Sequence, residues 1–146
     1  MTKVLIKPFT EKVLIPKYET SGSSGMDIAA FIENNIEIKP GEKALISTGF
    51  SLSIPRGFEI QIRPRSGLAA KKSISVLNTP GTIDADYRGE IKIILINHGK
   101  ENFIVENGLR IAQMVLCPVV QAKLEVVEKL VDTDRGTDGF GSTGIK

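Results

Sequence analysis

Short apolar runs separated by turn-forming residues recur along the whole chain, at intervals of about eight to twelve residues, a spacing typical of β-sandwiches and barrels. In segment 58–63, large apolar side chains alternate with Glu, Gln and Arg, so one face of a strand should be buried and the other wet. The pattern predicts strands at 3–6, 42–46, 58–63, 73–77, 90–97, 102–105 and 111–120. Glycine, proline and asparagine between these runs predict turns at 39–41, 55–57, 79–81, 97–99 and 107–108.

Segment 66–72 is the only one with a helical pattern, and Ser66 should cap its start while two lysines favour its end. We therefore predict an all-β, double-sheet fold with one short helix. The length of 146 residues suits a single domain over 1–146. We expect a β core at about 1–132 and a mobile, glycine-rich C-terminal arm at 133–146.

Composition narrows the classes of function. Nineteen basic and seventeen acidic residues leave a net charge of +2, too small and scattered to predict a nucleic-acid groove. No apolar run approaches the roughly 20 residues needed to span a bilayer, and no signal peptide is expected. The single Cys117 lies in an apolar run, which predicts a buried, inert thiol without an internal disulfide. We expect a cytoplasmic protein that binds neither nucleic acid nor membranes.

Segment 81–90 concentrates the reactive side chains, with two acids, a tyrosine and an arginine between glycines. A carboxylate such as Asp84, held in a short turn beside the Tyr87 ring, could activate water next to a ring-containing substrate. The alternative is an ordinary turn in which the acids and glycines serve only the backbone, with Tyr87 in the core.

Arg65, Ser66 and Gly67 combine a guanidinium, a hydroxyl and exposed backbone N–H groups at the start of the predicted helix, a favourable place for an anion. The alternative is a simple helix cap preceded by a surface arginine. Residues 76–83 predict a hairpin whose mouth exposes backbone donors and acceptors, which a pyrimidine edge could pair with. The Asn78 amide could complete that pairing, or Asn78 could only form the turn. Such a site can reject a base of opposite pattern by about 10⁴-fold.

Five segments occur in the order and spacing of one known motif set: 24–27, 64–69, 81–90, 108–113 and 135–144. In these motifs the chain resembles the homotrimeric dUTPases, the deoxyuridine triphosphate nucleotidohydrolases, over about 25–144. The resemblance implies a jelly-roll-like trimer with its active sites at subunit interfaces. It also implies hydrolysis of dUTP to dUMP and pyrophosphate by attack of water on the α phosphorus, which limits uracil in DNA and supplies dUMP for dTMP synthesis.

The same resemblance implies roles for single residues. Asp84 would be the general base, and the Tyr87 ring would lie under the deoxyribose and leave no room for a 2'-hydroxyl. Ser66 would contact the bridge between the α and β phosphates, and Arg65 would lie near the phosphate chain. Asp27 would help to hold Mg²⁺ through its water ligands, as that ion favours. Gln113 would donate to a phosphate oxygen; otherwise it is a polar residue on the wet face of a strand. The remaining expected substrate contacts in the body are Gly67, Asn78, Gly81, Thr82 and Ile83.

The C-terminal segment is not a P-loop, because it lacks the Gly-Lys-Ser/Thr ending. By the resemblance, Arg135 would meet the γ phosphate and Phe140 would stack on uracil, while Gly141, Ser142 and Thr143 would help to cap the triphosphate. Closing such a lid expels water and completes a site. The alternative is a disordered terminus, and both descriptions hold if the arm orders only on binding.

Two rival functions remain open at this level. Deaminases of dCTP with a similar fold share the Ile-Asp-Ala run but place a catalytic glutamate several residues later, where this chain has Ile94. A non-catalytic jelly-roll module that binds a nucleotide or a protein partner is the other. Competent residues at every motif position favour the hydrolase.

Overall fold

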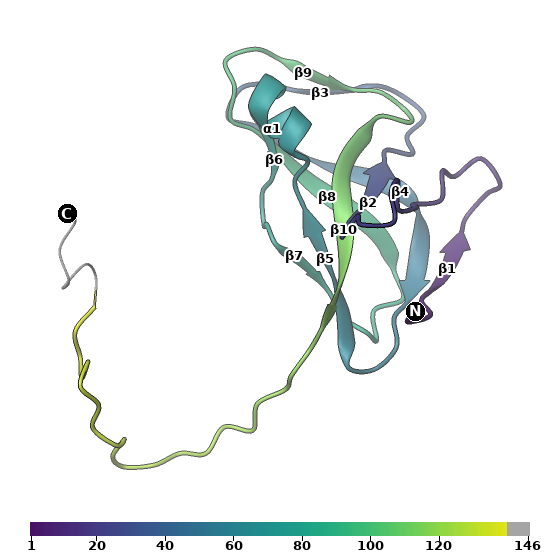
Figure 1. Cartoon of the computed structure of the whole chain (residues 1–146). Helices are drawn as coiled ribbons and strands as arrows, with labels where there is room; N and C mark the ends of the chain where they lie inside the picture. Colours follow the sequence, from purple (N-terminus) through teal and green to yellow (C-terminus); the bar gives the residue numbers. More distant parts are fainter. Residues whose placement is uncertain (140–146) are drawn as a thin grey trace.

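Strands dominate the computed structural model, which describes residues 1–139. Two four-stranded antiparallel sheets enclose one apolar core, and a single short helix lies beside them (Figure 1). The predicted all-β, double-sheet class with one helix is confirmed. No helix within 1–139 is both long and apolar enough to cross a bilayer.

The first sheet has the order β1-β4-β8-β6. Its strands are β1 (Leu5–Pro8), β4 (Lys43–Ser53), β8 (Glu90–Asn97) and β6 (Ile74–Val76). The second sheet has the order β2-β10-β5-β7. Its strands are β2 (Met26–Ala29), β10 (Arg110–Pro118), β5 (Phe58–Arg63) and β7 (Gly81–Ile83). A separate two-stranded ribbon pairs β3 (Ile36–Ile38) with β9 (Phe103–Val105).

Predicted and observed strands agree best where alternation is long. The predictions at 58–63 and 90–97 coincide with β5 and β8, and those at 3–6, 73–77, 102–105 and 111–120 overlap strands with shifted ends. The prediction at 42–46 stopped too early, because β4 continues through Gly49, whose positive φ of 75° accompanies a register shift against β8. The predictions missed β2, β3 and β7, each only three or four residues long.

The helix α1 (Ser66–Lys72) has the predicted bounds, and Lys71 and Lys72 occupy its last turn as expected. The predicted cap is wrong, however. Arg65 is the N-cap residue and makes no side-chain capping bond, while Ser66 is already the first helical residue. Its exposed side chain is therefore not needed as the cap and is free to serve a ligand.

The core is built from aliphatic side chains of both sheets, with Phe50, Ile60, Ile91 and Leu95 fully buried. Cys117 is not among the buried residues: it lies near the end of β10 with intermediate exposure, and Nη2 of Arg63 is 3.6 Å from its sulfur. The predicted burial of this thiol is therefore wrong, because the core ends before the strand does.

Candidate active site

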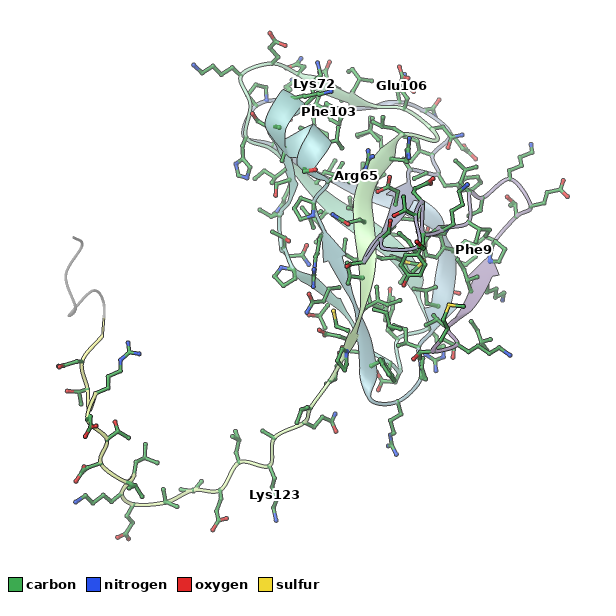
Figure 2. The ribbon with its side chains drawn as sticks, viewed as in Figure 1. Phe9, Arg65, Lys72, Phe103, Glu106 and Lys123 are labelled. Atoms are coloured by element: carbon green, nitrogen blue, oxygen red, sulfur yellow. The ribbon has the colours of Figure 1, made fainter. Side chains whose placement is uncertain are left out.

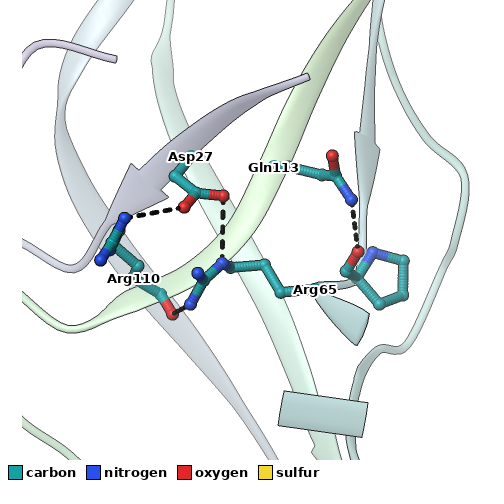
Figure 3. A network of polar contacts seen from close by, with 5 residues as sticks. Asp27, Arg65, Arg110 and Gln113 are labelled. Carbon is teal, nitrogen blue, oxygen red and sulfur yellow. Dashed lines mark hydrogen bonds and ion pairs between the residues drawn. The ribbon is translucent and has the colours of Figure 1, made fainter. Parts of the chain in front are cut away.

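Asp27 on β2 is the centre of a polar cluster. Its Oδ1 accepts from Nε of Arg65 at 3.0 Å, and its Oδ2 accepts from Nη1 of Arg110 at 3.2 Å (Figure 3). Arg65 also donates from Nη1 to the carbonyl oxygen of Arg110 at 3.0 Å. One carboxylate thus orients two guanidiniums from separate segments, and the cluster of three side chains keeps a net positive charge suited to a phosphate chain.

Gln113 lies directly opposite Asp27 in the β2–β10 pairing. Its Nε2 donates to the carbonyl oxygen of Pro64 at 3.0 Å, which ties β10 to the residue just before Arg65 (Figure 3). Its side chain fits because residue 25 is glycine: a Cβ there would lie 3.1 Å from Cδ of Gln113 and closer still to Oε1. One amide proton is used by the protein, and the second is available to a ligand, so the expected phosphate contact stays a prediction.

The residues around Asp27 determine how a cation could be held. Within 1–139, no group of three or more His, Cys, Asp or Glu side chains is gathered for a metal ion. Both Asp27 oxygens already accept from arginines, but each carboxylate oxygen can accept a second hydrogen bond. This arrangement fits an ion that keeps its waters and leans on ligand phosphates, as Mg²⁺ does, and does not fit a fully protein-coordinated ion.

Asp84 and Tyr87 lie in the loop between β7 and β8 and line one cavity of about 450 Å³. The Tyr87 amide donates to the carbonyl oxygen of Asp84 at 3.1 Å, which closes a tight turn. The Tyr87 side chain is 45% exposed, so the alternative of a core tyrosine is wrong. The other residues that line this cavity are Leu45, Thr82, Ile83, Glu90 and Lys92.

The segment 76–83 is not the predicted hairpin. Its two strands belong to different sheets, since β6 pairs with β8 and β7 pairs with β5. The chain crosses from one sheet to the other between β6 and β7. Each of these three-residue strands pairs with a longer strand, β8 or β5, and not with the other short strand. The crossing leaves β7 at the edge of its sheet, with one row of backbone donors and acceptors available to a ligand.

Asn78 lies over the start of that edge strand. A Cβ at Gly81 would be 3.3 Å from Nδ2 of Asn78, so the amide and the backbone of residue 81 are neighbours. The structure therefore brings Asn78, Gly81, Thr82 and Ile83 into one ledge beside the cavity of Asp84 and Tyr87.

The cavity of Asp84 and the polar cluster around Asp27 lie toward opposite ends of β5. Ile83 pairs with Ile60, and Asp84 follows it, whereas Arg63 ends the strand three residues beyond Ile60 and Arg65 comes after it. At about 3.3 Å per residue, roughly 10 Å of strand separates these two levels before Arg65 is reached. Within residues 1–139, the lining of the Asp84 cavity contains none of the residues expected to contact the phosphates or the metal ion, which are Asp27, Arg65, Ser66, Gly67 and Gln113.

The C-terminal segment after β10 leaves the body of the protein in an extended course (Figures 1 and 2). In this segment, Nε of Arg135 donates to the carbonyl oxygen of Asp138 at 2.9 Å, a local contact. Phe140, Gly141, Ser142 and Thr143 lie outside the described residues. The expected contacts of this segment with a substrate therefore stay predictions.

Some site residues were missed from the sequence. Arg110 lies within the fourth motif segment, but its partnership with Asp27 depends on the β2–β10 pairing and on a strand that was not predicted. Leu45, Glu90 and Lys92 come from the other sheet. Glu90 ends the central motif segment 81–90, but the ordinary strand pattern around Leu45 and Lys92 carries no local signal for a cavity.

Comparison with known proteins independently supports the resemblance to the dUTPases. A family model described as dUTPase matches residues 11–144. The chain is 55% identical over 147 residues to a deoxyuridine 5'-triphosphate nucleotidohydrolase of Maricaulis maris, covering 98% of this chain and 97% of the relative. A protein of the same name from Crocosphaera subtropica is 54% identical over 143 residues, covering 98% of this chain and 99% of the relative.

Solved structures give the same result at the level of the fold. The structure of the dUTPase of Staphylococcus bacteriophage 80alpha with dUPNHPP superposes on this chain with a TM-score of 0.88 at 26% identity. The match covers 99% of this chain and 100% of the phage protein.

Proposed function

The chain belongs to the dUTPase family and is a dUTP diphosphatase, and on that premise we propose that Asp84 is the general base of its reaction. The observation that carries the proposal is that Asp84 and Tyr87 line one cavity beside the free edge of β7. An edge strand offers alternating N–H and C=O groups, and uracil presents a matching edge. Asn78 extends this ledge at Gly81 and would complete the pairing with the base.

The proposed reaction needs no covalent intermediate. Asp84 accepts a proton from a water molecule, and the water oxygen attacks the α phosphorus of dUTP. A new P–O bond forms there, while the bond from the α phosphorus to the bridging oxygen breaks and pyrophosphate leaves with the bond electrons. Catalysis then comes mainly from positioning and from neutralising the charge on the leaving group.

The phosphate chain would be held by the cluster around Asp27. Arg65 and Arg110 carry the positive charge, Ser66 offers a hydroxyl, and Gln113 offers its second amide proton. We propose that Mg²⁺ accompanies the triphosphate and supplies charge neutralisation when bound. Asp27 would meet the ion's water ligands with the lone pairs that its arginines leave free.

We further propose a homotrimer with the active sites between subunits. The separation of Asp84 from Arg65 along β5 supports this proposal, because a neighbouring subunit could present its Asp27 cluster to the Asp84 cavity. The C-terminal segment supports it too: Val120, Leu124, Val126 and Val131 are each at least 90% exposed in the single chain. Aliphatic side chains on an extended segment favour burial against another subunit, and closed threefold symmetry gives three equivalent sites.

The alternatives are not favoured. A deaminase would need a carboxylate where the chain has Ile94, an apolar residue within β8. Pyrophosphate release from dUTP, UTP, dTTP and dCTP, measured beside ammonia release from dCTP, separates the hydrolase from a deaminase and from a binding module.

The base assignment has its own test. Asp84→Asn removes the proton acceptor but keeps the shape of the side chain, so turnover should fall by about 10³-fold while dUTP binding stays within a few-fold. Single-turnover kinetics and equilibrium binding measure the two separately. Near-normal turnover in this variant would remove Asp84 from the role.

A further inference from the structure

Gly89 lies against the hydroxyl end of the Tyr87 side chain. A Cβ built on Gly89 would lie 2.6 Å from Cζ and 3.0 Å from Cε2 of that ring, and closer still to the phenolic oxygen. These separations are shorter than carbon atoms in van der Waals contact allow. Any side chain at position 89 must therefore displace the ring or be displaced by it.

The requirement for glycine here concerns space and not backbone conformation. Among the described residues, the glycines with positive φ are Gly41, Gly49, Gly57, Gly108 and Gly136, and Gly89 is not one of them. The backbone at 89 therefore does not have the positive φ that favours glycine. What glycine provides at this position is an open surface on which the ring rests.

The ring is held on that surface by its own hydroxyl. The Tyr87 hydroxyl donates to the carbonyl oxygen of Glu90 at 3.0 Å. Glu90 is fixed in turn, because its Oε1 accepts from the amide of Gly49 on β4 at 3.1 Å and its Oε2 lies 3.6 Å from Nζ of Lys92. The chain of contacts from β4 through Glu90 sets where the ring stands in the cavity that it shares with Asp84.

We propose that Gly89 is a specificity-determining residue: by seating the Tyr87 ring, it sets the position of the wall that excludes a 2'-hydroxyl. The inference rests on the role that the dUTPase resemblance implies for Tyr87, whose ring would lie under the deoxyribose and leave no room for a 2'-hydroxyl. A side chain at position 89 displaces the Tyr87 ring and breaks the hydrogen bond from the Tyr87 hydroxyl to Glu90. Because the Tyr87 ring is half exposed, it can move without disturbing the core. A ring that is no longer held in one position discriminates less between deoxyribose and ribose.

The test is Gly89→Ala in the full-length chain, with kcat/KM measured for dUTP and for UTP. For dUTP, kcat/KM should fall about tenfold, and the ratio of UTP to dUTP should rise about tenfold, the usual scale for a misfit of one methyl group. Gly22→Ala is the matched control, because a Cβ at Gly22 meets nothing within 4 Å. It should leave both values unchanged.

A double-mutant cycle shows whether Gly89 acts through the ring. Tyr87→Ala alone should raise the UTP to dUTP ratio, and adding Gly89→Ala to it should change the ratio by less than about twofold. An unchanged ratio in Gly89→Ala, with a raised ratio in Tyr87→Ala, overturns the inference and leaves the role of Tyr87 standing. An unchanged ratio in Tyr87→Ala overturns the role of Tyr87, and the inference falls with it.

The same pair of variants covers a failure to fold. Should Gly89→Ala not yield folded protein, the double variant with Tyr87→Ala should, because the clashing ring is gone. Recovery of folding, measured by circular dichroism and thermal melting, then supports the proposed contact between Gly89 and the Tyr87 ring. A double variant that also fails to fold would overturn it.

Discussion

Asp27 is a single side chain that we propose serves two tasks, because it orients two arginines and would also meet the water ligands of Mg²⁺. The carboxylate is partly buried, with 23% of its side chain exposed, and it accepts hydrogen bonds from both Arg65 and Arg110. A lone surface ion pair contributes little, but one acceptor that fixes two guanidiniums reduces the freedom of both. The arginines are therefore aimed before any ligand arrives, which lowers the ordering cost of binding.

Asp27→Asn tests this dual role. The amide replaces one of the two acceptor oxygens with an NH2 group, so one of the two arginine contacts is lost and kcat/KM for dUTP should fall by about tenfold, the scale of one lost charge-assisted hydrogen bond. Raising the Mg²⁺ concentration should recover only part of the loss, and the rest reports on the aim of the arginines. Complete recovery would show that the carboxylate serves the ion alone, and no recovery that it serves only the arginines.

At this scale the sequence predicts which residue types matter better than it predicts their partners. Asp84, Tyr87 and Asn78 were predicted because a carboxylate, an aromatic ring and an amide lie close together in the sequence, in or just before a segment that resembles a dUTPase motif. The bond between Asp27 and Arg110 was not predictable, because 83 positions separate the two residues and only strand pairing joins them. The hydrogen bond of Gln113 to Pro64 is of the same kind.

Among the elements, β8 shows how one buried polar residue connects parts of the fold. Asn97 at its end is fully buried and donates from Nδ2 to the carbonyl oxygens of Ile38 and Glu101, each at 2.8 Å. Its Oδ1 accepts from the amide of Gly99, also at 2.8 Å. The β3–β9 ribbon is thus joined to the main sheet through one side chain with all its partners satisfied.

Asn97→Ala should lower the free energy of unfolding by about 3 kcal/mol, because it leaves two carbonyl oxygens and one amide without their partner. The midpoint of urea denaturation measures the loss. Asn102→Ala is a matched control on the nearby surface, since Asn102 is exposed, and its effect should stay within about 0.5 kcal/mol. Equal losses in the two variants would show that the buried bonds contribute nothing specific.

The limits of prediction for elements have a physical cause. Long strands such as β5 and β8 show several repeats of alternating buried and exposed positions, and their bounds were predicted correctly. A strand of three residues, such as β7, has too few positions for alternation to be seen, so its presence depends on the partner β5. The edge that would recognise uracil is consequently one that sequence patterns cannot place.

For the whole molecule, the strands end at Pro118, before the predicted core boundary at 132. A chain that ends at Asp132 therefore keeps every described strand and should fold with an unchanged melting temperature. It should lose turnover by about 100-fold or more, because the removed arm would no longer exclude water and bind the triphosphate. Steady-state assays and thermal melting measure the two effects. Full activity in the shortened chain would end the lid proposal.

The proposed trimer yields a test that depends on the distance between the two halves of the site. Asp84→Asn subunits keep an intact Arg65 cluster, and Arg65→Ala subunits keep an intact Asp84. If each site joins Asp84 of one subunit to Arg65 of the next, random mixing at equal amounts restores both groups in about one site in four. Mixtures made by refolding together should then reach about a quarter of wild-type turnover, although each parent refolded alone stays nearly inactive. A mixture no more active than its parents would place the whole site within one subunit, and the roughly 10 Å of β5 between Ile60 and Arg63 would have to be bridged by the substrate alone.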